Sequence, residues 1–367
     1  MKINKLSVFS IVVSALLFSC NEDEQILNTK DYEGGNTDEQ ILDTKDYEGG
    51  VLVSGEGSSA GTGSVSFVST DLSFSEQFIF KNTNNSELGT YLQSLAFSST
   101  NAYISVDNQN TITVVDRYSF EEVTKITEGL ETPRYMTVVG DKGYSTNWGS
   151  TSVDTDDFVA VIDLNSNAVV QKIPVALGPE RIVENDGKLY VSHKGAWSTN
   201  NLVSVIDIAT DNVAEVTVGD NPDELFFDAN GILHVLSEGR TIYDESWAVS
   251  GHTLASIAKI DVVSNTVIST IEFAEGAHPS LFEISGDDLY YYINNNIYSL
   301  KTSATSLPTE AYAETGAING MAINDVNLFT VAARYSALSD LNVYQLSDKT
   351  MVNTFKVGLG ASKIYFN

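Results

Sequence analysis

The side chains best suited to binding chemistry in this sequence are aromatic and charged residues that stand between its short apolar runs. All three tryptophans, Trp148, Trp197 and Trp247, occur in such connections. A large ring in a loop is favourable when a ligand or a neighbouring loop covers it. Arg and Lys side chains nearby could pair with acidic groups of a ligand, so this set predicts recognition of a bulky, partly planar, acidic molecule. The predicted ligand-binding residues are Arg134, Tyr135, Asn147, Trp148, Arg181, His193, Lys194, Trp197, Glu238, Arg240, Tyr243, Trp247, His278, Arg334 and Tyr335.

Some of these residues have an equally good structural interpretation. Arg134 and Arg181 occupy the same position of a sequence repeat, so ion pairs between neighbouring repeats explain them as well as ligand contact does. One or two of the tryptophans could wedge neighbouring loops apart. The segment between Ser237 and Ser256 is longer than an ordinary connection, and its Trp and Tyr favour a functional loop.

The elements that must position these side chains are visible in residues 179–218. Four short apolar runs are separated by turn residues, including an Asn-Asp-Gly turn at 185–187 that favours a tight hairpin. Similar units begin at Pro133, Pro222 and Pro279, and less regular ones near Leu92 and Asn319. A period of roughly 40–50 residues with four strands per unit is typical of a β-propeller. We therefore predict an all-β, seven-bladed propeller of four-stranded antiparallel blades.

The two ends of the repeat region complete one blade. Val51–Val53, Ser64–Ser69 and Gln77–Phe80 fit its second, third and fourth strands, and the C-terminal Lys363–Phe366 fits its first. Pairing the chain ends in one blade closes the ring and covers two exposed sheet edges. The predicted propeller spans residues 51–367.

The N-terminal segment predicts export. Basic residues 1–5 and apolar residues 6–19 indicate a signal peptide over 1–19. Cys20 is the single cysteine, so disulfides and thiolate metal sites are excluded. Residues 17–20 resemble the bacterial lipoprotein signal, which implies lipidation of Cys20; a soluble exported protein is the alternative. Residues 20–50 contain a near-exact duplication and too little apolar content to fold, and we interpret them as an acidic tether.

The net charge and the catalytic motifs missing from the sequence restrict the classes of function that fit this protein. The net charge of −29 argues against nucleic acid and against electrostatic binding to anionic membranes, because both need a cationic surface. The lipid chain would supply the membrane attachment. Hydrolase, zinc-protease and phosphate-loop motifs do not occur in the sequence, so we predict a non-enzyme with no cofactor and no metal.

A family resemblance is carried by residues 133–149, 178–191 and 203–222, and by the opening segment 50–57. Together they resemble the YVTN-type seven-bladed propeller lipoproteins of Bacteroidetes, and the acidic residues after Cys20 resemble the signal that sends such lipoproteins to the outer cell surface. The resemblance implies a lipid-anchored protein on the surface of the outer membrane. It would capture a nutrient such as a corrinoid or an iron-siderophore or other metal chelate, and pass it to a TonB-dependent transporter. The alternatives are a propeller enzyme of the lactonase or quinone-dependent dehydrogenase type, with carboxylates such as Glu56 and Glu180 near the axis, and an adhesin.

Overall fold

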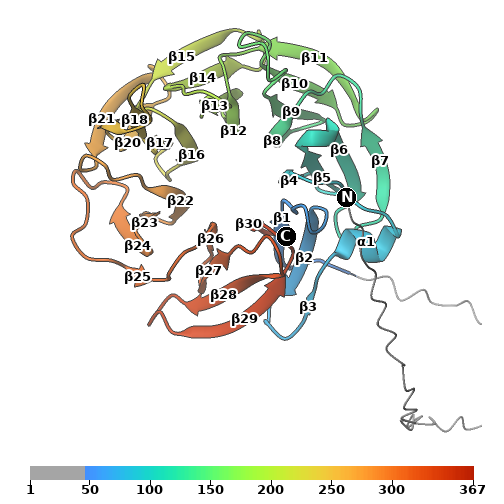
Figure 1. The fold of residues 1–367 in the computed structure, drawn as a ribbon. Helices are drawn as coiled ribbons and strands as arrows, with labels where there is room; N and C mark the ends of the chain where they lie inside the picture. Colours follow the sequence, from blue (N-terminus) through green and yellow to red (C-terminus); the bar gives the residue numbers. More distant parts are fainter. Residues whose placement is uncertain (1–45) are drawn as a thin grey trace, which may run out of the picture. The chain divides into compact units, whose positions relative to one another are not determined.

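The computed structural model describes residues 46–367 and shows seven four-stranded antiparallel sheets arranged around a central channel (Figure 1). The predicted fold is confirmed. Strands rich in Val, Ile, Thr and Tyr suit this architecture because branched and aromatic side chains pack well between stacked sheets. The predictions for the signal peptide (1–19), for Cys20 and for most of the tether (20–50) lie outside the described residues.

The strands are numbered in chain order and grouped here by blade. Blade 1 contains β1 (Gly50–Gly55), β2 (Ser64–Ser69), β3 (Ser75–Glu76) and β30 (Ala361–Phe366). Blades 2 and 3 contain β4 (Leu92–Phe97), β5 (Asn101–Val106), β6 (Thr111–Asp116) and β7 (Glu122–Ile126), then β8 (Pro133–Val139), β9 (Lys142–Asn147), β10 (Phe158–Asp163) and β11 (Ala168–Pro174). Blades 4 and 5 contain β12 (Pro179–Asn185), β13 (Lys188–His193), β14 (Leu202–Asp207) and β15 (Val213–Thr217), then β16 (Pro222–Phe227), β17 (Leu233–Ser237), β20 (Ser256–Asp261) and β21 (Thr266–Glu272). Blades 6 and 7 contain β22 (Ser280–Ser285), β23 (Asp288–Ile293), β24 (Asn296–Lys301) and β25 (Ala313–Glu314), then β26 (Gly320–Ile323), β27 (Asn327–Ala332), β28 (Ser339–Gln345) and β29 (Met351–Val357).

The ring is closed by the C-terminal strand. In blade 1 the order is β3-β2-β1-β30, so β30 supplies the inner strand, and Val53 lies opposite Ile364 in the antiparallel register. The packed unit also extends a few residues before β1, because Tyr47 is buried and its ring contacts Phe67 and Phe120 edge-on. The predicted closure by the two chain ends is confirmed.

The fourth strand of blade 1 was predicted wrongly. It is the two-residue β3, and Gln77–Phe80 leads instead into the short helix α1 (Ile79–Asn84). Ile79 and Phe80 both pack into the one apolar cluster that joins blades 1 and 2, whereas consecutive residues of a strand would point to opposite faces. A helical turn lets both side chains reach that cluster. Among the described residues no helix is long and apolar enough to cross a membrane.

The core lies between neighbouring blades and is divided into seven apolar clusters within the described region. The cluster between blades 4 and 5, for example, joins Tyr190 and Val203 to Leu225 and Val235. Each such fully buried side chain stabilises the fold by about 1.5–3 kcal/mol. The blades thus form a rigid ring whose inner strands line the channel.

An irregularity in these inner strands determines the chemistry of the channel. The register shifts by one residue between Pro133 and Met136 in β8, and at the equivalent places in β12 and β16. A regular strand would turn alternate side chains away from the channel, whereas a bulge re-aims an extra one. Consecutive charged residues therefore reach the same space.

The long connection of blade 5 is an ordered hairpin rather than an irregular loop. It is formed by β18 (Arg240–Tyr243) and β19 (Val249–Thr253), which pair as a two-stranded sheet.

Candidate functional site

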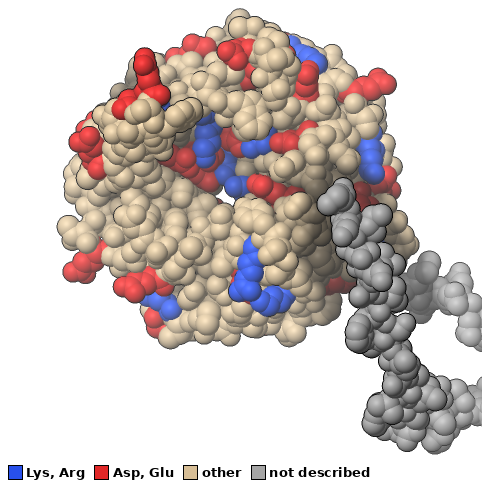
Figure 2. Space-filling view, in the orientation of Figure 1, with Lys and Arg blue, Asp and Glu red and all other residues tan. Residues whose placement is uncertain are grey.

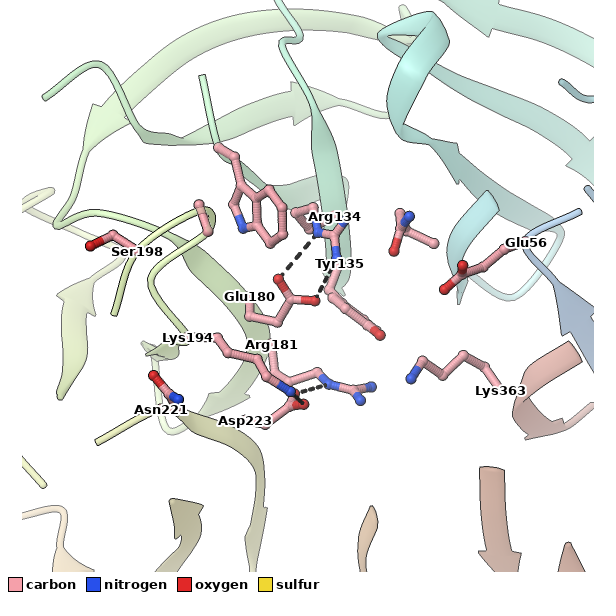
Figure 3. Close-up of a pocket in the computed structure, with 13 residues that line it drawn as sticks. Glu56, Arg134, Tyr135, Glu180, Arg181, Lys194, Ser198, Asn221, Asp223 and Lys363 are labelled. Carbon is pink, nitrogen blue, oxygen red and sulfur yellow. Dashed lines mark hydrogen bonds and ion pairs between the residues drawn. The ribbon is translucent and has the colours of Figure 1, made fainter. Parts of the chain in front are cut away.

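A cavity of about 410 Å³ opens at the end of the channel where the loops between second and third strands meet the loops between blades (Figure 3). Figure 2 shows basic and acidic side chains gathered in the hollow at the centre of this face. The lining residues are Glu56, Gln93, Arg134, Tyr135, Trp148, Glu180, Arg181, Lys194, Ala196, Ser198, Asn221, Asp223 and Lys363.

Arg134, on β8, is held by carboxylates on two sides. It donates from Nη1 to Asp107 at 2.9 Å, and from Nε and Nη2 to the two oxygens of Glu180 at 3.1 and 2.9 Å. Its guanidinium carbon lies 3.7 Å from the ring centroid of Trp148. The two-pronged pair and the stacking fix the position of the guanidinium group. Because Glu180 belongs to β12, the predicted ion pair between repeats is present.

Arg181 repeats the arrangement one blade further on. It donates from Nε to Asp223 at 2.8 Å and from Nη2 to Glu224 at 2.6 Å, and it lies 4.2 Å from the ring centroid of Tyr135. Lys194 donates to the other oxygen of Asp223 at 2.6 Å and to Glu238 at 3.0 Å. Burial alone would raise the pKa of Asp223, but Lys194 and Arg181 outweigh it and hold that pKa well below its usual range. The three cations are thus occupied by carboxylates.

Lys363, on the inner strand β30, differs from them. Its ammonium group forms no hydrogen bond and no ion pair with any of residues 46–367, although it lines the cavity. Burial and the nearby positive charge of Arg181 lower its pKa, and Glu224 and Asp223 oppose that shift only partly. Lys363 is therefore the cavity's available cation for an acidic ligand group.

A second, smaller cavity of about 180 Å³ adjoins the first, and we call it the lower compartment. The inner strands start at the loop face, and most residues of this compartment come later along those strands than the residues of the first cavity. The compartment therefore lies deeper in the channel. Tyr135, Arg181 and Lys363 line both spaces. The other residues of the lower compartment are Glu224, Phe226, Leu281, Phe282, Glu283, Met321, Ser362, Ile364 and Tyr365.

The carboxyl group of Glu283 gives the lower compartment a pH response that can be measured. Burial, and secondly the charge of Glu224, raise the pKa of Glu283 from about 4.5 to about 8, with Arg181 and Lys363 lowering it in part. Between these pH values the folded chain binds more protons than the unfolded chain, so the stability that Glu283 contributes falls as the pH rises. Between pH 6 and 8 we expect the wild type to lose about 2 kcal/mol more unfolding free energy than Glu283→Gln, which cannot ionise.

Urea denaturation at several pH values measures this difference. The matched control is Glu272→Gln, since Glu272 is exposed at the end of β21 and should leave the pH dependence of the wild type intact. Parallel curves for the wild type and Glu283→Gln would show that the Glu283 carboxyl is ionised normally in the folded chain.

The three tryptophans do not form one group. Trp148 lines the cavity. Trp197 is not itself a lining residue, although its neighbours Ala196 and Ser198 are; its ring contacts that of Trp148 edge-on with centroids 5.9 Å apart, and 74% of its surface is exposed. Trp247 is 83% exposed near the tip of the hairpin in blade 5, where it contacts Tyr243 and is not part of the cavity lining. Two tryptophans therefore stand at the mouth and the third stands on the insertion.

The remaining predicted residues lie outside the cavity lining. Asn147 and His193 are fully buried at strand ends, where Asn147 accepts from the backbone of Glu131 at 3.0 Å and His193 lies 2.8 Å from the Ser204 hydroxyl. Of the others, Glu238 forms an ion pair with Lys194, Arg240 with Asp220 and Arg334 with Asp340. His278 is hydrogen-bonded to His252, and Tyr335 is half exposed.

The lining residues absent from the predicted set include three acidic ones, Glu56, Glu180 and Asp223. Glu180 and Asp223 each follow the proline that opens a repeat, directly beside Arg181 and Glu224. That shared position was a usable signal, because equivalent repeat residues must face the same channel. Gln93, Asn221 and Glu283 carry no comparable signal in the sequence. Among residues 46–367, no group of three or more His, Cys, Asp or Glu side chains is arranged to hold a metal ion.

With the geometry described, the chain can be compared with known proteins. No protein family and no curated protein matches it. Solved structures share its fold. Kuenenia stuttgartiensis hydrazine synthase is 16% identical with a TM-score of 0.57, covering 76% of this chain and 92% of that one. Dihydro-heme d1 dehydrogenase NirN in complex with DHE is 13% identical with a TM-score of 0.53 over 86% and 75%.

The computationally designed Ika8 protein is 11% identical with a TM-score of 0.55, over 88% and 92% of the two chains. Identities this low show a common fold alone, and function must be argued from the site. Fold and site together define a seven-bladed β-propeller with a charged cavity at the mouth of its channel. The YVTN-type resemblance and the lipoprotein signal stay predictions.

Proposed function

We propose that the protein is a capture protein that binds an acidic, partly planar nutrient ligand at the mouth of its propeller channel. The observation that carries this proposal is the Trp148–Trp197 pair beside a charged cavity. Trp197 exposes 74% of its surface at the mouth. An exposed indole of this size is a typical anchor for a flat ligand, because covering it removes a large apolar area from water.

The cavity favours a particular way of binding. Ligand pockets of about 300–1,000 Å³ enclose drug-sized molecules, and this one measures about 410 Å³. Because the volume of this cavity is near the lower end of that range, a corrinoid or a metal chelate would insert one acidic arm and keep its ring system outside, against Trp197. Since Arg134, Arg181 and Lys194 are already paired, the acidic group of that arm would go to Lys363.

The proposal also includes attachment of the protein to the membrane and delivery of the ligand to a transporter. A lipid on Cys20 would hold the propeller at the outer surface of the outer membrane, and a TonB-dependent transporter would receive the ligand. The net charge of −29 supports a small-molecule ligand over nucleic acid.

Matched tryptophan variants test the binding site. The purified protein is titrated by calorimetry with cobalamins, haem and ferric siderophores. We expect Trp197→Ala to weaken binding of the preferred ligand about tenfold, equivalent to about 1.4 kcal/mol, because the ring system loses its stacking surface. Trp247→Ala, which removes an equally exposed ring from the hairpin, should bind as the wild type does.

Three other outcomes would overturn this proposal. Equal losses of affinity in Trp197→Ala and Trp247→Ala would show that the ligand does not bind at the cavity. No binding together with turnover of a sugar lactone or an alcohol would identify a propeller enzyme. Binding only to a glycan or a protein would identify an adhesin.

A further inference from the structure

The lower compartment contains an amine and a carboxyl group that have no partner among the described residues. Lys363 and Glu283 both line it, and neither forms a hydrogen bond or ion pair with any of residues 46–367, nor do they pair with each other. Uncompensated charge away from bulk water is unfavourable, and such groups are normally paired or hydrogen-bonded. The space between these two groups is therefore suited to a molecule that presents a negative group to one and a positive group to the other.

Glu224 supplies a second acceptor on the same side as Glu283. The residue as a whole is only 8% exposed, and its Oε1 accepts from Arg181 at 2.6 Å. Its Oε2 is buried and has no hydrogen-bond partner. An ammonium group has three donors, so it could bind the carboxyl of Glu283 and, after a small rotation of the side chain, this free oxygen.

One part of the lower compartment's wall is apolar. Phe226 and Phe282 contact each other with ring centroids 6.1 Å apart, and Leu281, Met321 and Ile364 also belong to this part. Aromatic and thioether side chains take up an aliphatic group well, and an aromatic face also attracts a nearby ammonium. The volume of about 180 Å³ suits a molecule with a few carbon atoms beyond its charged groups.

We propose that the lower compartment binds a small zwitterion of the α-amino acid class, with its carboxylate at Lys363, its ammonium group at Glu283 and Glu224, and an aliphatic side chain against Phe226 and Phe282. This site is distinct from the proposed capture site, because Glu283, Phe226 and Phe282 do not line the upper cavity. Lys363 lines both spaces, so a carboxylate bound in either one competes for the same ammonium group. An acidic arm bound above should therefore weaken zwitterion binding below.

Proton linkage gives the site a signature that simple apolar binding lacks. With a pKa of about 8, the Glu283 carboxyl is largely protonated at neutral pH. An ammonium group favours its ionised form, so binding should release a proton and tighten as the pH rises from 6 to 8. The titratable groups that line the compartment with it are Tyr135, Arg181, Glu224, Lys363 and Tyr365.

The test is calorimetry on the full chain with matched ligands. A panel of alanine, valine, norvaline, leucine and methionine identifies the best size. The tightest ligand is then compared with its analogue lacking the ammonium group and its analogue lacking the carboxylate; for norvaline these are pentanoate and butylamine. We expect the zwitterion to bind at least tenfold tighter than either analogue. Titrations in two buffers of different ionisation enthalpy should show release of a proton at pH 7.

Two variants should separate the contributions. Glu283→Gln should weaken the zwitterion about tenfold, abolish proton release and leave the carboxylate-only analogue unaffected. Lys363→Met should weaken the zwitterion and leave the amine-only analogue unaffected, and Lys363→Arg should restore part of the loss. Glu272→Gln, on the exposed end of β21, is the control for an uninvolved carboxylate.

Failure of this inference is distinguishable from failure of the proposed capture function. No binding of any amino acid at millimolar concentration, equal affinity for the zwitterion and one analogue, or unchanged binding in Glu283→Gln would overturn the zwitterion site. None of these results would contradict capture of a larger ligand at Trp197, because Glu283 does not line the upper cavity.

Discussion

Replacement of Arg181 by methionine is expected to lower the free energy of unfolding by about 3–5 kcal/mol. Arg181 is the shared partner of Asp223 and Glu224, whose side chains are each 10% exposed. Methionine fills a similar volume but leaves Glu224 without an ion-pair partner and Asp223 paired with Lys194 alone, within residues 46–367. Removing one partner of a buried ion pair leaves an uncompensated charge, and that is more harmful than replacing the whole pair by apolar groups.

Urea denaturation of the wild type and the variant at pH 7 measures this loss. Arg334→Met is the matched control, since the side chain of Arg334 is 53% exposed beside Asp340, and exposed pairs contribute about 0–1 kcal/mol. Adding Glu224→Gln to Arg181→Met should recover part of the stability, because the amide is neutral. The deficit should also shrink as the pH falls and both carboxyl groups become protonated. A loss under 1 kcal/mol at pH 7 would mean that water in the channel screens these charges.

The repeat pattern was sufficient to predict the fold. Each unit must bury both faces of a small sheet, so units of about 40–50 residues specify stacked blades whatever the details of their loops. The same reasoning predicted β30 as the inner strand of blade 1, because an unpaired edge at each chain end is unfavourable. It misjudged Gln77–Phe80, where Ile79 and Phe80 begin the short helix α1 and pack into the same apolar cluster. A short apolar run does not distinguish these conformations.

The site was only partly predictable, and the reason lies in the bulges. A loop-by-loop interpretation identified Trp148 and Lys194, which do follow second strands, and Arg134, Tyr135 and Arg181 at the junctions between blades. Most of the cavity wall instead comes from the inner strands themselves, where one extra residue turns Glu180 and Arg181 toward the channel together. No residue type marks a bulge of this kind in the sequence. The lack of partners at Lys363 and Glu283 was also not predictable, because it depends on distances between blades 1 and 6.

The charges of the channel follow from this architecture. The bulges in β8, β12 and β16 bring charged side chains to the axis, and neighbouring blades supply the opposite charge, so Arg134 and Arg181 connect three consecutive blades. Such pairs fix the relative positions of the inner strands. Where blades 1 and 6 line the channel, the described residues form no equivalent ion pair, and Lys363 and Glu283 have no hydrogen-bond or ion-pair partner there. Structure-stabilising and ligand-binding charges are thus separated within one ring, and the two sets can be tested with different variants.

Removal of β30 is expected to have the largest effect of all, abolishing cooperative folding of the propeller. A chain ending at residue 360 loses the strand that pairs with β1, together with the contacts of Ile364 and Tyr365 in two apolar clusters. The partly buried side chains of this strand, at up to about 1.5–3 kcal/mol each, and its hydrogen bonds to β1 amount to a large share of the stability of a typical domain, about 5–15 kcal/mol. The exposed edge of β1 should also promote aggregation.

Thermal unfolding followed by circular dichroism, with size-exclusion chromatography, measures this outcome. The control is a chain ending at Phe366, which loses only Asn367 and its bonds to Gly50, Tyr47 and Arg117 and should keep a cooperative transition. A synthetic peptide of residues 358–367 should restore monomeric, folded protein to the truncated chain by adding the missing strand in trans. A truncated chain that unfolds cooperatively as a monomer without the peptide would show that the interfaces between the other blades hold the ring, and that pairing of the chain ends is dispensable.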